Sequence, residues 1–368
     1  MARLGDLIEQ IRGVSYKPED LCDSLNEDGI PLLRASNIQD GKLNFEDIIY
    51  IDKKKVKSNQ YLKSGDILVC TSSGSKELVG KAAFVENDLS ITFGAFCKVI
   101  RPKICCPKYI GHFFDSPYYR KRISASSAGA NINNIRNEHI DEIDIRLPST
   151  DEQKQISAVL DKVSDLISLR KQQLTKLDEL VKARFVELFG DPITNSKRLP
   201  TERMELRFNL KAGITTAADD IHDFEKGRYE IPCYGGNGIR GYVKEKSYEG
   251  NFPIIGRQGA LCGNVQYATG KFHATEHAVL VSLLKDDNEV WVYYLLKLMD
   301  LYRYHTGAAQ PGLSVKTLNT VDVIVADKCL QNQFAAFVEQ TDKSKVAVQK
   351  ALDEAQLLFD SLMQKYFG

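Results

Sequence analysis

The sequence predicts an α+β protein in which two similar domains are each followed by one long helix. Its 368 residues are enough for two or three domains, and 43% hydrophobic with 27% charged residues is typical of a globular chain. Two long segments have apolar residues spaced as in amphipathic helices. The second half of the chain also repeats the first, which makes each domain and its helix one copy of a duplicated unit.

The repeat is visible without gaps in the second part of each copy. GANINNIRNEHIDEIDIRLPSTDEQ, from Gly129, aligns with GAAQPGLSVKTLNTVDVIVADKCLQ, from Gly307, at an offset of 178 that continues to the end of the chain. Near the start, IRGVS at Ile11 matches KAGIT at Lys211 at an offset of 200, so the second copy is 22 residues shorter (200 − 178). We therefore expect domains over 1–147 and 191–327, and long helices over 148–190 and 328–368.

Both domains are predicted to be rich in β-strands. Runs such as GDILVC, SITFGAFCKVIRP and FPIIG are β-branched or aromatic and are separated by Gly, Ser and Asn turns. Each domain also has one shorter helical segment, around CPKYIGHFFDSPYYRKRIS in the first and NEVWVYYLLKLMDLYRY in the second. The order of the strands is not visible in the sequence.

The first long helix has a start and a stop signal. Thr150 and Gln153 match a capping box, and Pro148 disfavours an earlier start. Gly190, followed by Asp-Pro, is a typical helix end. In the second helix Lys328 stands at the position of Thr150, so the same cap is not available there.

Both long helices carry an apolar seam with coiled-coil spacing, which predicts that they pack against each other. Two copies related by a pseudo-twofold axis would place them antiparallel, and about 35 residues at ~1.5 Å each predict a rod of roughly 50 Å. The seam is interrupted by Arg170, Thr341 and Lys345. Packing of each helix on its own domain alone is the alternative. The predicted helix–helix spacer residues are Ile156, Leu160, Val163, Ile167, Leu174, Leu177, Val181, Phe185, Phe334, Val338, Val348, Leu352, Phe359 and Met363.

Composition excludes several classes of protein. No segment approaches the roughly 18 apolar residues of a membrane span, and MARLGDLIEQIRG has acidic residues where a signal peptide would be apolar. The eight cysteines include no Cys-x-x-Cys pair, which favours reduced thiols in the cytoplasm. The net charge is zero, which is unusual for a protein that binds nucleic acid tightly on its own.

The motif search predicts a chain without catalytic activity. HATEH, from His273 to His277, matches an inverted zinc motif, but its flanks look strand-like, and in a strand the two histidines would be about 13 Å apart. We expect no metal there. GSKELVGKA, from Gly74, resembles a phosphate-binding loop but has Ala82 where Ser or Thr would hold magnesium. Acyl transfer, dinucleotide and base-methylation motifs are also missing.

Polar, glycine-rich loops at matching places in both halves have suitable side chains for contacting base edges. Arginine matches guanine, whereas asparagine and glutamine match adenine. Such loops are often plain turns, but here the positions recur while the residues differ. Basic residues over 98–122 and 53–57 are candidates for phosphate contacts or for a solvated face. The predicted DNA-binding residues are Arg34, Asn37, Ser72, Ser73, Ser75, Lys76, Asn131, Asn133, Asn134, Tyr234, Asn237, Arg240, Arg257, Gln258, His277 and Gln310.

With these motifs the chain, from about residue 3 to 368, resembles the specificity subunit of type I restriction–modification systems. The resemblance rests on the LPSTDEQ helix opening at Leu147, the LFGDP close at Leu188, GDIL at Gly65, IGRQG at Ile255 and the tandem second copy. It implies two target recognition domains that each recognise half of a split DNA sequence, with the paired helices holding the halves apart.

The resemblance also implies partners. Two modification subunits that methylate adenine N6 would dock on the helices, and a restriction or translocase subunit would cleave unmodified double-stranded DNA. This chain would need no cofactor, because the partner subunits bind S-adenosylmethionine and ATP.

Three alternatives remain at this point. The chain would be an assembly scaffold without DNA binding if replacing Arg257 and Gln258 changed nothing. It would be an enzyme if HATEH bound zinc and His277→Ala abolished activity. It would also be consistent with a specificity-like subunit of another phage-defence methylation system.

Overall fold

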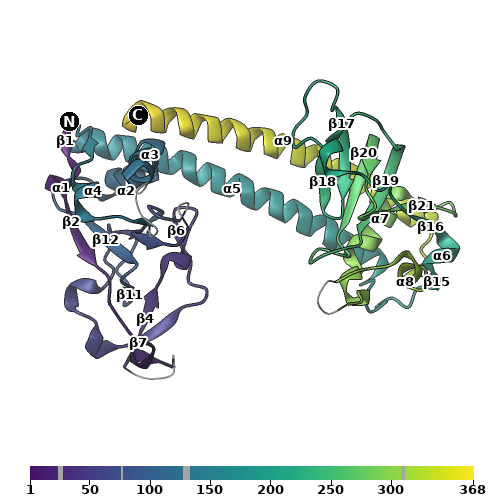
Figure 1. Ribbon diagram of the computed structural model, residues 1–368, viewed down its shortest axis with the longest axis horizontal. Helices are drawn as coiled ribbons and strands as arrows, with labels where there is room; N and C mark the ends of the chain where they lie inside the picture. Colours follow the sequence, from purple (N-terminus) through teal and green to yellow (C-terminus); the bar gives the residue numbers. More distant parts are fainter. Residues whose placement is uncertain (24–27, 76–77, 127–132, 308–310) are drawn as a thin grey trace. The chain divides into compact units, whose positions relative to one another are not determined.

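The structure is a computed structural model that divides into two compact units (Figure 1). It describes residues 1–23, 28–75, 78–126, 133–307 and 311–368. Unit 1 comprises Met1–Arg170 and Lys350–Gly368, and unit 2 comprises Lys171–Gln349. Each unit therefore contains one domain and a segment of each long helix.

Unit 1 contains two four-stranded sheets. The first is antiparallel, with the order β10-β8-β12-β2, and the second has the order β11-β4-β7-β3, in which β11 runs parallel to β4. The strands of the first sheet are β2 (Ile8–Arg12), β8 (Ile67–Cys70), β10 (Ala82–Phe84) and β12 (Cys97–Pro102). Those of the second are β3 (Leu21–Cys22), β4 (Gly29–Leu33), β7 (Ile49–Asp52) and β11 (Thr92–Phe93).

Short strand pairs and four helices complete the domain of unit 1. The pairs are β1 (Ala2–Arg3) with β14 (Asp144–Ile145), β5 (Ile38–Gln39) with β6 (Lys42–Leu43), and β9 (Ser72–Ser73) with β13 (Asn133–Asn134). The helices are α1 (Leu4–Leu7), α2 (Pro107–Asp115), α3 (Pro117–Ser126) and α4 (Asn137–Asp141). Helices α2 and α3 bury Tyr109, Phe113 and Tyr119 in one core cluster with Ile67 and Ile100 of the first sheet.

Unit 2 has one six-stranded sheet with the order β16-β21-β19-β20-β17-β18. Its strands are β16 (Phe208–Ala212), β17 (Ile231–Gly235), β18 (Gly238–Val243), β19 (Tyr248–Gly256), β20 (Val265–Ala274) and β21 (Ala278–Leu283). A further pair joins β15 (Thr201–Arg203) to β22 (Asp322–Ile324), and the short helices are α6 (Met204–Arg207), α7 (Glu289–Leu298) and α8 (Val315–Asn319). Trp291 and Leu295 of α7 share a core cluster with Phe208 and Val281.

The sequence repeat is also a structural repeat. Elements β2 and α1 correspond to β16 and α6 at the offset of 200, and α4 corresponds to α8 at the offset of 178. The order β2-β12-β8 recurs as β16-β21-β19. Strand β20 pairs with both β19 and β17, so the counterparts of the two unit 1 sheets form a single sheet in unit 2.

The glycine shared by the IRGVS and KAGIT motifs is required by a close backbone approach. A Cβ atom at Gly13 would lie 2.1 Å from the carbonyl oxygen of Gly94, and one at Gly213 would lie 2.3 Å from that of Ala274. Both distances are far inside van der Waals contact. In each copy of the repeat, this glycine therefore lies where two backbone segments come too close for any side chain.

The long helices are α5 (Thr150–Phe189) and α9 (Lys328–Phe367), and their segments pack antiparallel within each unit (Figure 1). In unit 1, Leu160 of α5 is in one core cluster with Met363 of α9, whereas Ile167, further along α5, clusters with Ala355. In unit 2, the ring of Phe185 lies 5.4 Å from that of Phe334. The predicted α+β fold with two long antiparallel helices is confirmed.

The seam residues differ in how completely they are buried. Leu174, Leu177, Val348, Leu352 and Phe359 are half-buried, and the other predicted seam residues are buried. The polar interruptions are accommodated: the Thr341 hydroxyl donates to the carbonyl of Phe337 at 2.9 Å, and Lys345 forms an ion pair with Asp178 at 2.7 Å. This pairing across the two helices lets a charged residue occupy the seam of unit 2.

The predicted capping box of Thr150 and Gln153 is wrong. The hydroxyl of Ser149, one residue earlier, accepts from the Glu152 N–H at 3.3 Å. Asp327, the counterpart of Ser149 at the offset of 178, accepts from Cys329 N–H at 2.8 Å. Both helices therefore have a side-chain cap at the same repeat position.

Gln153 and its counterpart Gln331 instead fasten the long helices to their domains. The side-chain oxygen of Gln153 accepts from the Cys106 N–H at 2.9 Å, just before α2. That of Gln331 accepts from the Asn288 N–H at 2.7 Å, just before α7. The amide groups also donate to the carbonyls of Pro148 and Ala326. The same fastening in both units explains why this glutamine is repeated.

Candidate nucleic-acid interface

Three backbone segments converge at one place in unit 1. The Thr71 and Ser72 N–H groups donate to the carbonyl of Phe96 at 2.9 and 3.1 Å. The Ile135 N–H donates to the carbonyl of Thr71 at 2.8 Å, and Asn134 pairs with Ser72 in the β13–β9 ladder. The segments at 71–73, 94–97 and 133–136 therefore form a single framework.

Unit 2 contains the same framework with other side chains. The Arg257 N–H donates to the carbonyl of His277 at 3.0 Å, and the Leu313 N–H donates to the carbonyl of Arg257 at 2.8 Å. Gln258 forms an antiparallel bridge with Gly312. By these shared bonds and bridges Arg257 corresponds to Thr71, Gln258 to Ser72 and His277 to Phe96, as Leu313 does to Ile135 at the offset of 178.

A cavity of about 590 Å³ opens at the framework of unit 1. Its lining is Gln10, Arg12, Thr71, Ser72, Ala95, Phe96, Lys98, Asn134, Ile135, Arg136, Asn137 and Glu138. Three of these side chains are basic and one is acidic, a balance that favours an anionic ligand. Lys98 donates to the side-chain oxygen of Gln10 at 3.3 Å, and burial lowers its pKa. Arg12 and Arg136 are exposed.

In unit 2 the framework carries polar atoms with unused hydrogen-bonding capacity. Arg257 Nε, Thr275 Oγ1 and His277 Nδ1 are buried and have no hydrogen-bond partner among the described residues. Gly236 lies against this cluster, because a Cβ placed there would be 3.3 Å from the His277 carbonyl. Because unsatisfied buried polar groups are rare in proteins, a bound water or ligand would be expected to supply partners to these atoms.

The structure brings several of the predicted DNA-binding residues together. In unit 1, Ser72 and Ser73 pair with Asn134 and Asn133, and Ser75 is exposed just beyond them. In unit 2, Gln258 is exposed, and Arg257 and His277 are half-buried beside it. Lys76, Asn131 and Gln310 lie outside the described residues.

The β17–β18 turn adds two more predicted residues to unit 2. Asn237 is exposed and accepts from the amide of Asn264 at 2.6 Å. Arg240 is exposed on β18. Gly256 allows the turn to approach the framework, since a Cβ there would lie 1.9 Å from the carbonyl oxygen of Gly236.

Asn37 was predicted to contact DNA, but the structure places it inside its own loop. It is 1% exposed, its side-chain oxygen accepts from the Arg34 N–H, and its amide donates to the carbonyls of Asn44 and Glu46. The side chain is consumed by its own loop and has no edge left for a base. Arg34 is partly committed as well, because Nη2 donates to the carbonyl of Asp47 at 2.8 Å. Tyr234 packs its ring on Phe272, with centroids 5.7 Å apart.

The basic clusters predicted for phosphate contact are divided by the fold. Arg101 forms a bidentate pair with buried Asp66, with both distances 2.7 Å, and Lys55 pairs with Asp20 at 2.7 Å. These cations are therefore engaged in ion pairs within the domain. Lys98 lines the framework cavity, whereas Arg101 and Lys55 do not.

Sequence reasoning missed Gln10, Arg12, Phe96 and Arg136 as lining residues. Arg12 stands on β2 directly opposite Lys98 on β12, a register that depends on the strand order. Phe96 stands in an apolar run that predicts a strand, and it carries no polar signal. The sequence contains one hint, because alignment of SITFGAFCKV with the HATEH segment pairs Phe96 with His277.

The HATEH segment crosses a turn rather than lying in one strand. His273 lies near the end of β20, and His277 lies in the turn before β21. The ring nitrogens of His273 contact the hydroxyls of Thr216 and Ser247, the former at 2.8 Å. Within the described residues there is no group of His, Cys, Asp or Glu arranged to hold a metal ion.

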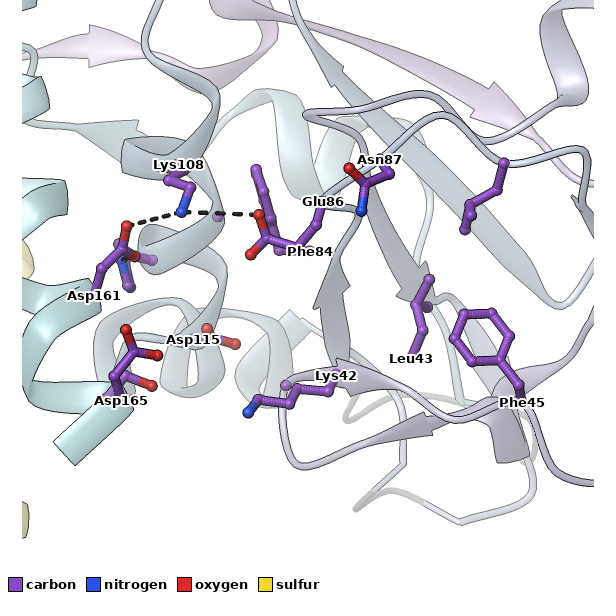
Figure 2. A pocket seen from close by; sticks show the side chains of 15 residues that line it. Lys42, Leu43, Phe45, Phe84, Glu86, Asn87, Lys108, Asp115, Asp161 and Asp165 are labelled. Carbon is purple, nitrogen blue, oxygen red and sulfur yellow. Dashed lines mark hydrogen bonds and ion pairs between the residues drawn. The ribbon is translucent and has the colours of Figure 1, made fainter. Parts of the chain in front are cut away.

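A second cavity of about 550 Å³ lies in unit 1 beside α2 and α5 (Figure 2). Lys108 is held there between Asp161 at 2.9 Å and Glu86 at 3.8 Å. Glu86, Asp115, Asp161 and Asp165 outnumber the two lysines of its lining. The surplus of carboxylates disfavours phosphate, so the framework cavity is the better candidate for a nucleic-acid interface.

Comparison with known proteins gives a consistent family. A family model described as the type I restriction modification DNA specificity domain matches residues 1–179 and 195–355. The type I restriction enzyme StySPI specificity subunit of Salmonella potsdam is 43% identical over 173 residues, which are 47% of this chain and 37% of that protein. The EcoKI specificity subunit of Escherichia coli K12 is 42% identical over 173 residues, with the same coverage. The matches thus span well under half the length of these two relatives.

A more distant relative and two solved structures cover more of the chain. The MjaIX specificity subunit of Methanocaldococcus jannaschii is 22% identical over 352 residues, 86% of this chain and 80% of that protein. The S subunit from M. genitalium has a TM-score of 0.62 at 17% identity, covering 100% of this chain and 95% of its own. A chain from a study of complex assembly and conformational transition of the type I R-M system has a TM-score of 0.58 at 16% identity, covering 100% and 96%. These structural likenesses show the fold.

None of the helices in the described residues has the length and apolar character of a membrane span.

Proposed function

Because the chain belongs to the type I restriction–modification DNA specificity family, we propose that it recognises a split DNA target, with each unit contacting one half. The observation that carries the proposal is the repeated framework. Equivalent backbone bonds hold Thr71 and Arg257, and Ser72 and Gln258 pair with equivalent positions of the repeat, yet the side chains presented differ. A constant scaffold with variable polar edges suits two half-sites of different sequence.

The charge distribution supports a division of labour with partner subunits. The chain has no net charge, but the framework cavity of unit 1 has three basic residues and one acidic residue. We propose that phosphate contacts from two docked modification subunits supply much of the affinity, while this chain supplies sequence specificity. A restriction subunit would join the same complex.

We further propose that α5 and α9 set the length of the unspecified gap between the half-sites. Two half-sites about one helical turn apart, roughly 34 Å, would present both to one side of the duplex. The chain itself would carry no cofactor, since methyl transfer and DNA translocation would use S-adenosylmethionine and ATP bound by the partner subunits.

The test is a map of methylated adenines. The chain is expressed with the modification subunit of the same system, and N6-methyladenine is located by single-molecule sequencing of the host DNA. A motif of two short specific blocks around a fixed gap is expected. Arg257→Ala with Gln258→Ala should relax one block, and Ser72→Ala with Asn134→Ala should relax the other.

The two double variants control for each other, because each includes one of the equivalent residues Ser72 and Gln258. Relaxation of both blocks by either variant would indicate general damage rather than half-site recognition. If no motif appears although the two proteins copurify, the proposal fails and the chain is an assembly scaffold.

A further inference from the structure

We infer that Phe96 is a specificity-determining residue of unit 1, with its ring placed to contact the 5-methyl group of a thymine in the half-site. The inference rests on the proposed function and deepens it. Phe96 is 69% exposed, the most exposed phenylalanine of the described residues, ahead of Phe224 at 59% and Phe45 at 50%. It lines the framework cavity, where the neighbouring side chains include Arg12, Lys98 and Asn134.

The backbone around Phe96 is fixed, so the exposed ring is presented from a defined position. Its carbonyl accepts from the N–H groups of Thr71 and Ser72. The Cys97 N–H donates to the carbonyl of Gly94 at 2.8 Å and closes the turn that carries the ring. Cys97 is fully buried and anchors the following strand. An ordered backbone lowers the conformational entropy lost when the ring binds.

The chemistry of the cavity selects the ligand group. In the major groove of DNA the base edges present hydrogen-bond donors and acceptors, and the one apolar group is the thymine methyl. Asn134 and Ser72 supply hydrogen-bonding groups, and Arg12 and Lys98 supply charge. The phenyl ring of Phe96 has none of these capacities, so its complement on a base edge is the methyl group.

The repeat gives an internal comparison. His277 occupies the position of Phe96 in unit 2, because its carbonyl accepts from Arg257 N–H as that of Phe96 accepts from Thr71 N–H. A histidine at this position offers a hydrogen bond instead of an apolar surface. The thymine methyl contact is therefore specific to unit 1, and the equivalent position in unit 2 recognises a polar edge.

The experiment replaces thymines of the target with deoxyuridine, which removes only the methyl group. The complex of this chain with its modification subunits is titrated with fluorescent duplexes in which each thymine of the unit 1 half-site is replaced in turn. At one position the affinity of the wild-type complex should fall about 4-fold, the equivalent of one methyl group losing its burial. Phe96→Ala should bind the thymine and uracil duplexes equally.

Phe96→Leu and His277→Ala are the matched variants. Leucine keeps an apolar surface and should retain the preference for thymine, and His277→Ala should retain it because it alters the other half-site. The inference is overturned if no uracil weakens the wild-type complex, or if Phe96→Ala keeps the wild-type ratio. It is also overturned if Phe96→Ala weakens binding to all duplexes while that ratio persists, because the ring then acts elsewhere, as a wedge between base steps would.

The same titration separates this inference from the proposed function. A complex that prefers its target to a scrambled duplex but ignores every methyl group retains the proposed function without the Phe96 contact. A complex with no preference for its target refutes both.

Discussion

Replacing Asp287 should destabilise unit 2 much more than replacing its neighbour Asp286. The Asp287 side chain is 2% exposed and accepts from two nitrogens of Arg207, with Nε–Oδ2 at 3.1 Å and Nη2–Oδ1 at 2.5 Å. It also accepts from the amide of Gln331 at 2.9 Å. One carboxylate thus connects α6 to the start of α9.

The magnitude follows from what remains after Asp287→Ala. Removing one partner of a buried ion pair costs about 3–5 kcal/mol, because the other charge stays buried. Arg207 keeps a second partner, Glu202 at 3.0 Å, so the lower figure of about 3 kcal/mol applies. For a unit of this size that corresponds to a fall in Tm of roughly 6–12 °C.

Asp286→Ala is the control. Its side chain is 91% exposed and pairs with Lys328 at 2.6 Å, a surface ion pair that contributes at most about 1 kcal/mol. Both variants remove one aspartate, so net charge changes equally. Thermal unfolding of the full chain, followed by circular dichroism and calorimetry, measures the difference. Equal shifts for the two variants would refute the assignment of the Asp287 network as a fastening of α9.

Three further outcomes are expected. Burial, opposed by Asp161, lowers the pKa of His112 below 6.5. The unfolded chain therefore binds a proton at a higher pH than the folded chain, so the free energy of unfolding should decrease as the pH falls through about 6.5. Urea titrations at several pH values should show a smaller decrease in His112→Asn. Identical pH dependence in the wild type and the variant would contradict this. Alkylation followed by mass spectrometry should label exposed Cys329 first. Buried Cys97, whose pKa is raised by burial, should be labelled only after unfolding. Early labelling of Cys97 would contradict its position in the core. Asp327→Ala should cost about 1 kcal/mol in urea unfolding by removing the α9 cap, whereas no change would mean that the cap is replaced.

Several features of the fold could be predicted from local patterns. The seams of α5 and α9 are periodic over many turns, so neither helix depends on distant contacts to be recognised. The capping box could not be predicted in the same way, because Ser149 competes with Thr150 as the cap and Gln153 is used by the domain instead. Which residue caps a helix depends on tertiary contacts as well as on sequence.

The candidate interface was only partly predictable. Arg257 and Gln258 were predicted as contacts because polar side chains in glycine-rich loops are a visible signal. Asn37 has the same signal, yet its amide bonds its own loop. Phe96 has the opposite signal and lines the framework cavity. Residue type alone does not distinguish an exposed contact from a structural one.

The sequence by itself determined the duplication, the α+β class and the two long helices, because these depend on composition and on periodicity along the chain. Only the tertiary structure decided that the segments at 71–73, 94–97 and 133–136 meet, and that their counterparts meet in unit 2. Their meeting depends on strand order and register, which are set by pairing between residues far apart in the chain. A shift of one residue in the β9–β13 register would turn Ser72 to the opposite face.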